Sequence, residues 1–153
     1  MKSLLFIISL FASTAAFAAD KVSLDSKVFV ERQVTSADGK QSIVREDPKL
    51  VVPGEKLLFV LNYKNEGAAP ADKFVVTNPI PQSVTFVASE AAGADVSVDG
   101  GKIWGPIASL KVKAADGSLR PASASDVTHV RWVFTKAIPV GGKGILSFRG
   151  VVR

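Results

Sequence analysis

Few residue types in this sequence can do chemistry, and they are scattered along the chain. There is one His, no Cys and a single Met at position 1. Disulfides, thiol nucleophiles and Cys-containing zinc sites are therefore excluded, and His129 alone cannot form a multi-histidine metal cluster. The sequence has no Gly-x-Ser-x-Gly motif to supply a nucleophilic serine and no glycine-rich phosphate loop that opens a helix. We therefore predict that the protein is not an enzyme and binds neither a metal nor another cofactor.

Residues 97–104 have the composition of a tight hairpin. Their sequence resembles the Asp-box of sialidase-type propellers, S-x-D-x-G-x-T-W, with Ile103 in place of Thr. Asp99 is expected to accept backbone N–H groups across the turn, Gly101 to take a positive φ, and Trp104 to pack beneath. We interpret Ser97, Asp99, Gly101 and Trp104 as a structural hairpin, with contact to a sugar as the alternative.

Residues 1–18 have the three parts of a secretory signal peptide. Lys2 precedes a short apolar run, and an A-x-A site is formed by Ala16 and Ala18. The run is too short to cross a hydrocarbon core, which needs about 20 apolar residues. We predict cleavage before Ala19, no membrane span after cleavage, and export to the periplasm or the extracellular space.

The rest of the chain has the pattern of short strands separated by turns. Apolar side chains alternate with period two over residues 57–64, 127–134 and 146–152. Weaker candidate strands are residues 27–34, 42–46, 74–78, 84–87, 96–98, 102–104 and 110–113. Three Asp-Gly pairs, which suit tight hairpin turns, lie among them. No long segment has helical spacing, and the one candidate helical turn is residues 89–94.

This pattern predicts an all-β fold: an antiparallel Ig-like β-sandwich of about seven to nine strands. We expect one domain after the signal peptide. Residues 19–49 would supply N-terminal strands or an extension, and residues 50–153 the core of the sandwich. Packing is expected to be densest where Trp132 and Phe134 lie opposite Phe59 and Leu61.

Two sequence blocks carry a family resemblance. The first is Val52-Pro53-Gly54-Glu55 followed by Leu57-Leu58-Phe59-Val60-Leu61-Asn62-Tyr63 and Asn65-Glu66-Gly67; the second is Val76-Thr77-Asn78-Pro79-Ile80-Pro81. With the segments around Trp104 and Trp132, they resemble the bacterial conserved-repeat domain of unknown function over residues 50–152. The resemblance implies an exported Ig-like module with a structural or adhesive role. It carries over no catalytic residues, and this chain has one copy where the family has tandem copies.

Charge is distributed unevenly along the sequence. Residues 19–101 carry nine basic and 12 acidic side chains, whereas residues 102–153 carry nine basic and two acidic ones. Neighbouring strands from the two parts would neutralise each other, or the basic part would form a face for anionic glycans, lipid headgroups or an acidic face of another copy. Nucleic acid is not expected as a partner of an exported protein that lacks a basic cluster interleaved with aromatic residues.

Two functions are compatible with these observations. The first is an exported, non-enzymatic β-sandwich with a structural, assembly or adhesive role at the bacterial cell envelope, either as an envelope component or self-associating at an open strand edge. The alternative is a soluble periplasmic or extracellular module that binds an anionic glycan or another carbohydrate. Such a module would use Tyr63, Trp104 or Trp132 as a stacking platform, although the alternation places Tyr63 and Trp132 on core faces.

Overall fold

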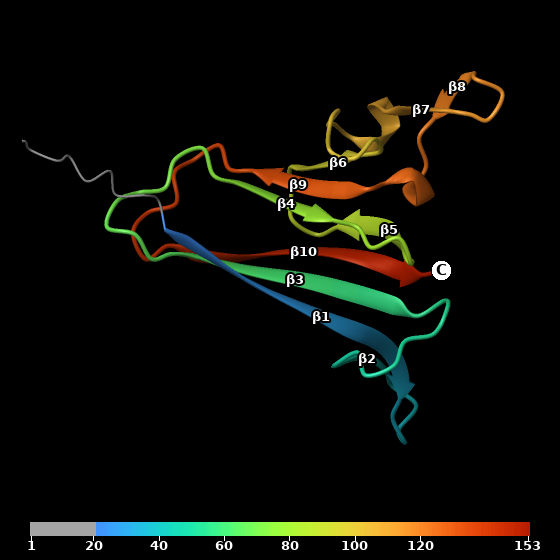
Figure 1. The fold of residues 1–153 in the computed structure, drawn as a ribbon. Coiled ribbons are helices and arrows are strands. Elements are labelled where there is room, and N and C mark those ends of the chain that lie inside the picture. Colours follow the sequence, from blue (N-terminus) through green and yellow to red (C-terminus); the bar gives the residue numbers. More distant parts are fainter. Residues whose placement is uncertain (1–20) are drawn as a thin grey trace, which may run out of the picture.

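The computed structural model describes residues 21–153. The predicted cleavage residues Ala16, Ala18 and Ala19 lie outside this range. The described residues form ten strands and two short 3₁₀ turns, without an α-helix among them (Figure 1). Every strand pair is antiparallel. The predicted all-β, antiparallel fold is confirmed at this level.

The larger sheet has five strands in the order β2-β1-β3-β10-β5. Its strands are β1 (Val22–Thr35), β2 (Gln41–Glu46), β3 (Lys56–Asn65), β5 (Val84–Ser89) and β10 (Lys143–Val152). The first strand and the last therefore flank β3, although they are far apart in sequence. Residues 22–46 supply two strands of this same sheet.

A three-stranded sheet forms the second layer above β3 and β10 (Figure 1). It has the order β4-β9-β6, with β4 (Val75–Pro79), β6 (Ala94–Ser97) and β9 (His129–Val133). A small hairpin of β7 (Lys111–Lys113) and β8 (Leu119–Pro121) lies outside both layers. The 3₁₀ turns are Ile107–Ser109 and Ala124–Asp126.

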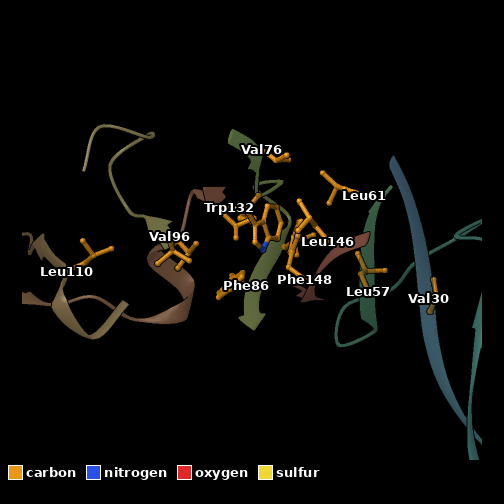
Figure 2. Close-up of a cluster of buried hydrophobic side chains, with 14 residues drawn as sticks. Val30, Leu57, Leu61, Val76, Phe86, Val96, Leu110, Trp132, Leu146 and Phe148 are labelled. Carbon is orange, nitrogen blue, oxygen red and sulfur yellow. The ribbon is translucent and has the colours of Figure 1, made fainter. Parts of the chain in front are cut away.

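Apolar side chains from both layers meet in one core (Figure 2). Phe148 is fully buried at its centre, with its ring stacked on Phe59 at 4.4 Å between centroids and 3° between planes. The Trp132 ring of the opposite layer lies 6.2 Å from the Phe148 ring. The buried core residues are Val30, Leu57, Leu61, Val76, Ile80, Val84, Phe86, Val96, Leu110, Val127, Val130, Trp132, Leu146 and Phe148.

The predicted aromatic core differs from the observed one in one residue. Trp132 is central as expected, but Phe134 lies at one end, 5.0 Å from Tyr63 and 5.6 Å from Phe74 between ring centroids. Phe148 takes the central place because it lies directly opposite Phe59 on the neighbouring strand.

The alternation predicted for residues 127–134 holds only from His129 onward. Val127 is buried in the core, whereas the Thr128 hydroxyl donates a 3.1 Å hydrogen bond to the Ser97 carbonyl. The 3₁₀ turn Ala124–Asp126 directly precedes these residues, and β9 begins at His129. Period two therefore starts two residues later than the sequence pattern suggests.

Two further predictions were wrong in detail. Residues 102–104 do not form a strand, because the N–H groups of Lys102 and Ile103 donate to the Asp99 carboxylate. Residues 89–94 do not form a helical turn. The two layers together contain eight strands, within the predicted seven to nine, and the β7–β8 hairpin adds two strands outside them. One of them, β8, lacks alternation and contains Pro121, so it gave no strand signal.

Candidate functional site

The predicted hairpin is closed by its own side chains. The Ser97 hydroxyl donates to Asp99 Oδ1 at 2.7 Å and accepts the Gly101 N–H at 2.9 Å. Asp99 Oδ1 also accepts the N–H groups of Lys102 and Ile103, both at 3.0 Å. The Ile103 N–H and the Ser97 hydroxyl hold the pKa of the Asp99 carboxyl below its usual range. The hairpin thus uses its polar groups to hold its own shape.

Trp104 likewise makes its contacts within the same chain. Its indole N–H donates to the Gly101 carbonyl at 2.8 Å. The Arg131 guanidinium lies 4.4 Å from the centroid of the indole ring and pairs with Asp95 at 3.0 Å. The His129 ring meets the indole edge-on at 6.3 Å. One face of Trp104 is therefore occupied by a cation of the same chain.

The side chains predicted as a sugar platform do not come together. Trp132 is buried in the core, Tyr63 is half-buried against Phe134, and Trp104 lies on the outer side of the three-stranded sheet. His129 has its Nδ1 3.0 Å from the Thr128 hydroxyl. Residues 21–153 contain no group of three His, Cys, Asp or Glu side chains placed to hold a metal ion.

An ion network covers part of the outer face of the five-stranded sheet. The Glu31 side chain is only 4% exposed. Its carboxylate accepts from Arg149 Nε at 2.6 Å, Arg149 Nη2 at 3.0 Å and Arg45 Nε at 3.2 Å. Arg149 also pairs with Glu90. The hydrogen bonds from Arg149 lower the pKa of Glu31, even though burial alone would raise it.

This network bears on the uneven charge of the sequence. Arg149 belongs to the basic part, and it pairs with Glu31 and Glu90 of the acidic part. Arg131 and Asp95 pair across the same division. At these positions strands from the two parts neutralise each other, which is the first of the two arrangements considered for the sequence.

A further candidate is a strand edge at the start of the fold. β1 pairs with β3 over residues 22–31, but β2 pairs only with residues 30–35 of β1. Residues 22–29, which we call the β1 edge, therefore have β3 on one side and no other strand of the described chain on the other. Figure 1 shows β2 beside only the far half of β1. The sequence pattern missed the first part of this strand, because Ser23 and Ser26 weaken its apolar alternation.

The β1 edge presents side chains of both signs and an apolar residue. Asp25, Ser26 and Lys27 are exposed, and Leu24 is 48% exposed. Alternation places Leu24, Ser26 and Val28 on the core side of the sheet, and Asp25 and Lys27 on its outer side. An exposed strand edge of this kind can pair with another chain.

Comparisons with family models, curated proteins and solved structures give no match to this chain. Among residues 21–153, no helix has the length and apolar character of a membrane span. The candidate site is therefore described from the chain's own geometry. Among the described residues, β2, β4 and β5 also have one unpaired side, and the β1 edge is the candidate that carries side chains of both signs.

Proposed function

We propose that this chain is an exported, non-enzymatic Ig-like β-sandwich with a structural, assembly or adhesive role at the bacterial cell envelope. Export is inferred from the signal-like residues 1–18, with cleavage before Ala19. The lack of Cys and of any Met beyond position 1 suits an oxidising compartment. The resemblance of residues 50–152 to the conserved-repeat domain of bacterial surface proteins points the same way.

The β1 edge is the observation that carries the assembly role. A strand with unpaired N–H and C=O groups along residues 22–29 offers backbone hydrogen bonds to an added strand. Native sheets usually protect such edges with bulges, prolines, covering loops or charged side chains, and of these the β1 edge has the charged side chains Asp25 and Lys27. The β10–β5 pairing shifts register between Arg149 and Gly150, where Val87 of β5 is the extra residue, and this irregularity is away from the β1 edge.

A ligand-binding role has less support. Trp104 is the more accessible of the two tryptophans, and its indole ring already has Arg131 over it. The carboxylates of Asp99 and Glu31 are held by hydrogen bonds within the chain. Both carboxylates thus already serve as acceptors for groups of the same chain, which leaves less of their surface for a ligand.

Cell fractionation combined with crosslinking tests the proposal. The full chain, expressed with a C-terminal tag, is expected in the envelope or periplasmic fraction with Ala19 as its first residue. Formaldehyde treatment of whole cells is expected to give adducts larger than the monomer. Full-length protein in the cytosol, or a free monomer without adducts, would contradict the proposal.

Two variants test whether the signal peptide is cleaved at the predicted site. Ala18→Phe puts a bulky side chain at a position where the peptidase accepts small ones, so the uncleaved precursor is expected to accumulate. Phe17→Leu changes the neighbouring position, which has no such restriction, and is expected to be processed like the wild type. Equal processing of both variants would contradict a cleavage site at this position.

A further inference from the structure

We propose that the β1 edge is a homotypic interface, at which residues 23–29 of two copies of this chain pair as antiparallel strands with Ser26 opposite Ser26. This rests on the assembly role proposed above and names its partner. Two five-stranded sheets would then join into one continuous sheet across a twofold axis.

The backbone groups that face the open side can be identified from their neighbours. The Glu66 N–H donates to the Lys21 carbonyl at 2.8 Å, so Lys21 faces β3. Asn65, which lies opposite Val22, instead exchanges hydrogen bonds with Gly141 and Gly142 on the far side of β3. Alternation then directs the N–H and C=O groups of Val22, Leu24, Ser26 and Val28 to the open side.

Hydrogen bonding restricts how a second copy can pair. Only residues 22, 24, 26 and 28 can donate and accept across the open side, so each of them must lie opposite another of them. With Ser26 at the axis, Ser26 lies opposite itself, and Leu24 lies opposite Val28 of the second copy. These pairs would form about six backbone hydrogen bonds, two for each hydrogen-bonded pair.

Charge selects this register among those that the hydrogen bonds allow. With the axis at Ser26, Asp25 lies opposite Lys27 of the second copy, and Lys27 lies opposite its Asp25. Both are non-hydrogen-bonded pairs, whose side chains approach more closely than those of hydrogen-bonded pairs. Moving the axis to Asp25 would place two aspartates opposite each other, and moving it to Lys27 would place two lysines so. Like charges directly opposite destabilise a sheet.

The length of the free edge agrees with the same register. β2 occupies this edge of β1 from Val30 onward, where Glu46 lies opposite Val30. Pairing therefore cannot extend past Phe29, and Val22 of the second copy has to turn away from the edge. Residues 23–29 are centred on Ser26, and their length slightly exceeds that of an average strand, about five to six residues. On the core side, the exposed Leu24 would gain an apolar neighbour in Val28 of the second copy.

Disulfide trapping tests the axis directly, because the chain has no other cysteine. In Ser26→Cys the two Cα atoms would lie about 5.5 Å apart, as in a hydrogen-bonded pair, which is a distance that a disulfide spans. The matched control is Ser23→Cys on the same strand, whose copies would lie roughly 20 Å apart. Protein isolated from cells expressing the full chain and oxidised mildly is expected to form a covalent dimer with Ser26→Cys and none with Ser23→Cys.

A charge exchange tests the register independently. Asp25→Lys and Lys27→Asp each turn two attractive pairs into repulsive ones, so each variant alone is expected to dimerise roughly 10- to 30-fold more weakly in sedimentation experiments. An equimolar mixture of the two restores opposite charges at both pairs and is expected to recover wild-type association. Asp25 and Lys27 are both exposed, so unchanged circular dichroism serves as the control for folding.

These outcomes separate the interface from the proposed function. No dimer with Ser26→Cys, equal trapping of both cysteine variants, or a disulfide to a different protein would overturn the homotypic interface. If the envelope adducts nevertheless persist, the assembly role stands without it. Efficient trapping of a protein that stays in the cytosol would instead overturn the envelope role and support the interface.

Discussion

Phe148 and Arg149 are neighbours on β10, yet their side chains enter opposite faces of the five-stranded sheet. Phe148 faces the second layer and is enclosed by Phe59, Phe86 and Trp132. Arg149 faces away from that layer and binds Glu31 and Glu90. One face is thus covered by another sheet, and part of the other face is covered by its own long side chains.

Leu58 shows how far this second kind of cover extends. It belongs to the outer face, where it lies opposite Phe29 on one side and Arg149 on the other, and it is only 2% exposed. Farther along the same face, Ile145 is 65% exposed. The outer face is therefore protected near the ion network and open near the β1 edge. Protection by flexible charged side chains is local, whereas a packed second layer covers a whole region.

The largest effect is expected from Phe148→Ala on the inner face. Removing a fully buried aromatic ring costs both its burial and the cavity left behind, about 3–5 kcal/mol. Urea denaturation followed by tryptophan fluorescence would measure this, since Trp132 reports on the same cluster. Phe148→Leu is the matched control and is expected to lose less. A loss below about 1 kcal/mol would show that the two layers are held together elsewhere.

Leu58→Ala tests whether the outer face is buried in solution. A loss of about 2–4 kcal/mol is expected, because the side chain is as inaccessible as those of the inner core. Leu58→Met, which roughly conserves volume, should cost less than about 1.5 kcal/mol. If Leu58→Ala were neutral, the charged side chains around it would not exclude water, and the comparison of the two faces would fail.

Glu31→Gln is expected to cost about 1–3 kcal/mol at neutral pH, since it removes the charge to which Arg149 and Arg45 donate. The effect should also depend on pH. Because the pKa of Glu31 in the folded protein lies below its ordinary value of 4.5, its contribution is complete above that value and is lost as the pH falls through the lowered pKa.

Denaturation curves at several pH values check this dependence. The difference between the wild type and Glu31→Gln is expected to shrink as the solution is acidified below about pH 4.5. Phe148→Ala should keep its full difference over the same range, because no titrating group is removed. A Glu31 effect that is independent of pH would mean that the carboxylate charge contributes nothing.

The smallest effect is expected from Ile145→Thr. This exposed residue lies on the same strand and face as Arg149, but away from its ion pairs. The free energy of unfolding should change by less than about 0.5 kcal/mol. A larger loss would show that protection of the outer face reaches the open end of the sheet, and the contrast within that face would have to be abandoned.

Local features of the fold were largely predictable. The alternation at Leu57, Phe59, Leu61 and Tyr63 and the Asp-Gly turns follow from interactions within a few residues. The hydrogen bonds of Asp99 also lie within its own hairpin. The break in alternation before β9 was not predictable in this way, because the turn that causes it is capped by Ser123 and Asp126, which precede the alternating residues 127–134.

The candidate site was only partly predictable. A sandwich of short strands is expected to have open strand edges, so self-association at such an edge could be considered from the sequence. Which edge is open depends on the order of the strands. β1 carries β2 on only part of its length, and no local pattern reports the length of that pairing. The charges of Asp25 and Lys27 are visible in the sequence, whereas their place on an unpaired edge is not.

The sequence by itself determined most of the strands and turns, the lack of thiol chemistry and the tight turn within residues 97–104. Those features depend on residue type and on neighbours a few positions away. Only the tertiary structure decided that Glu31 meets Arg149, which is 118 positions later, and that residues 22–29 lack a second strand. Strand order and pairing length come from contacts between distant segments. Every residue except proline carries the same backbone donor and acceptor, so these groups do not identify which segments pair.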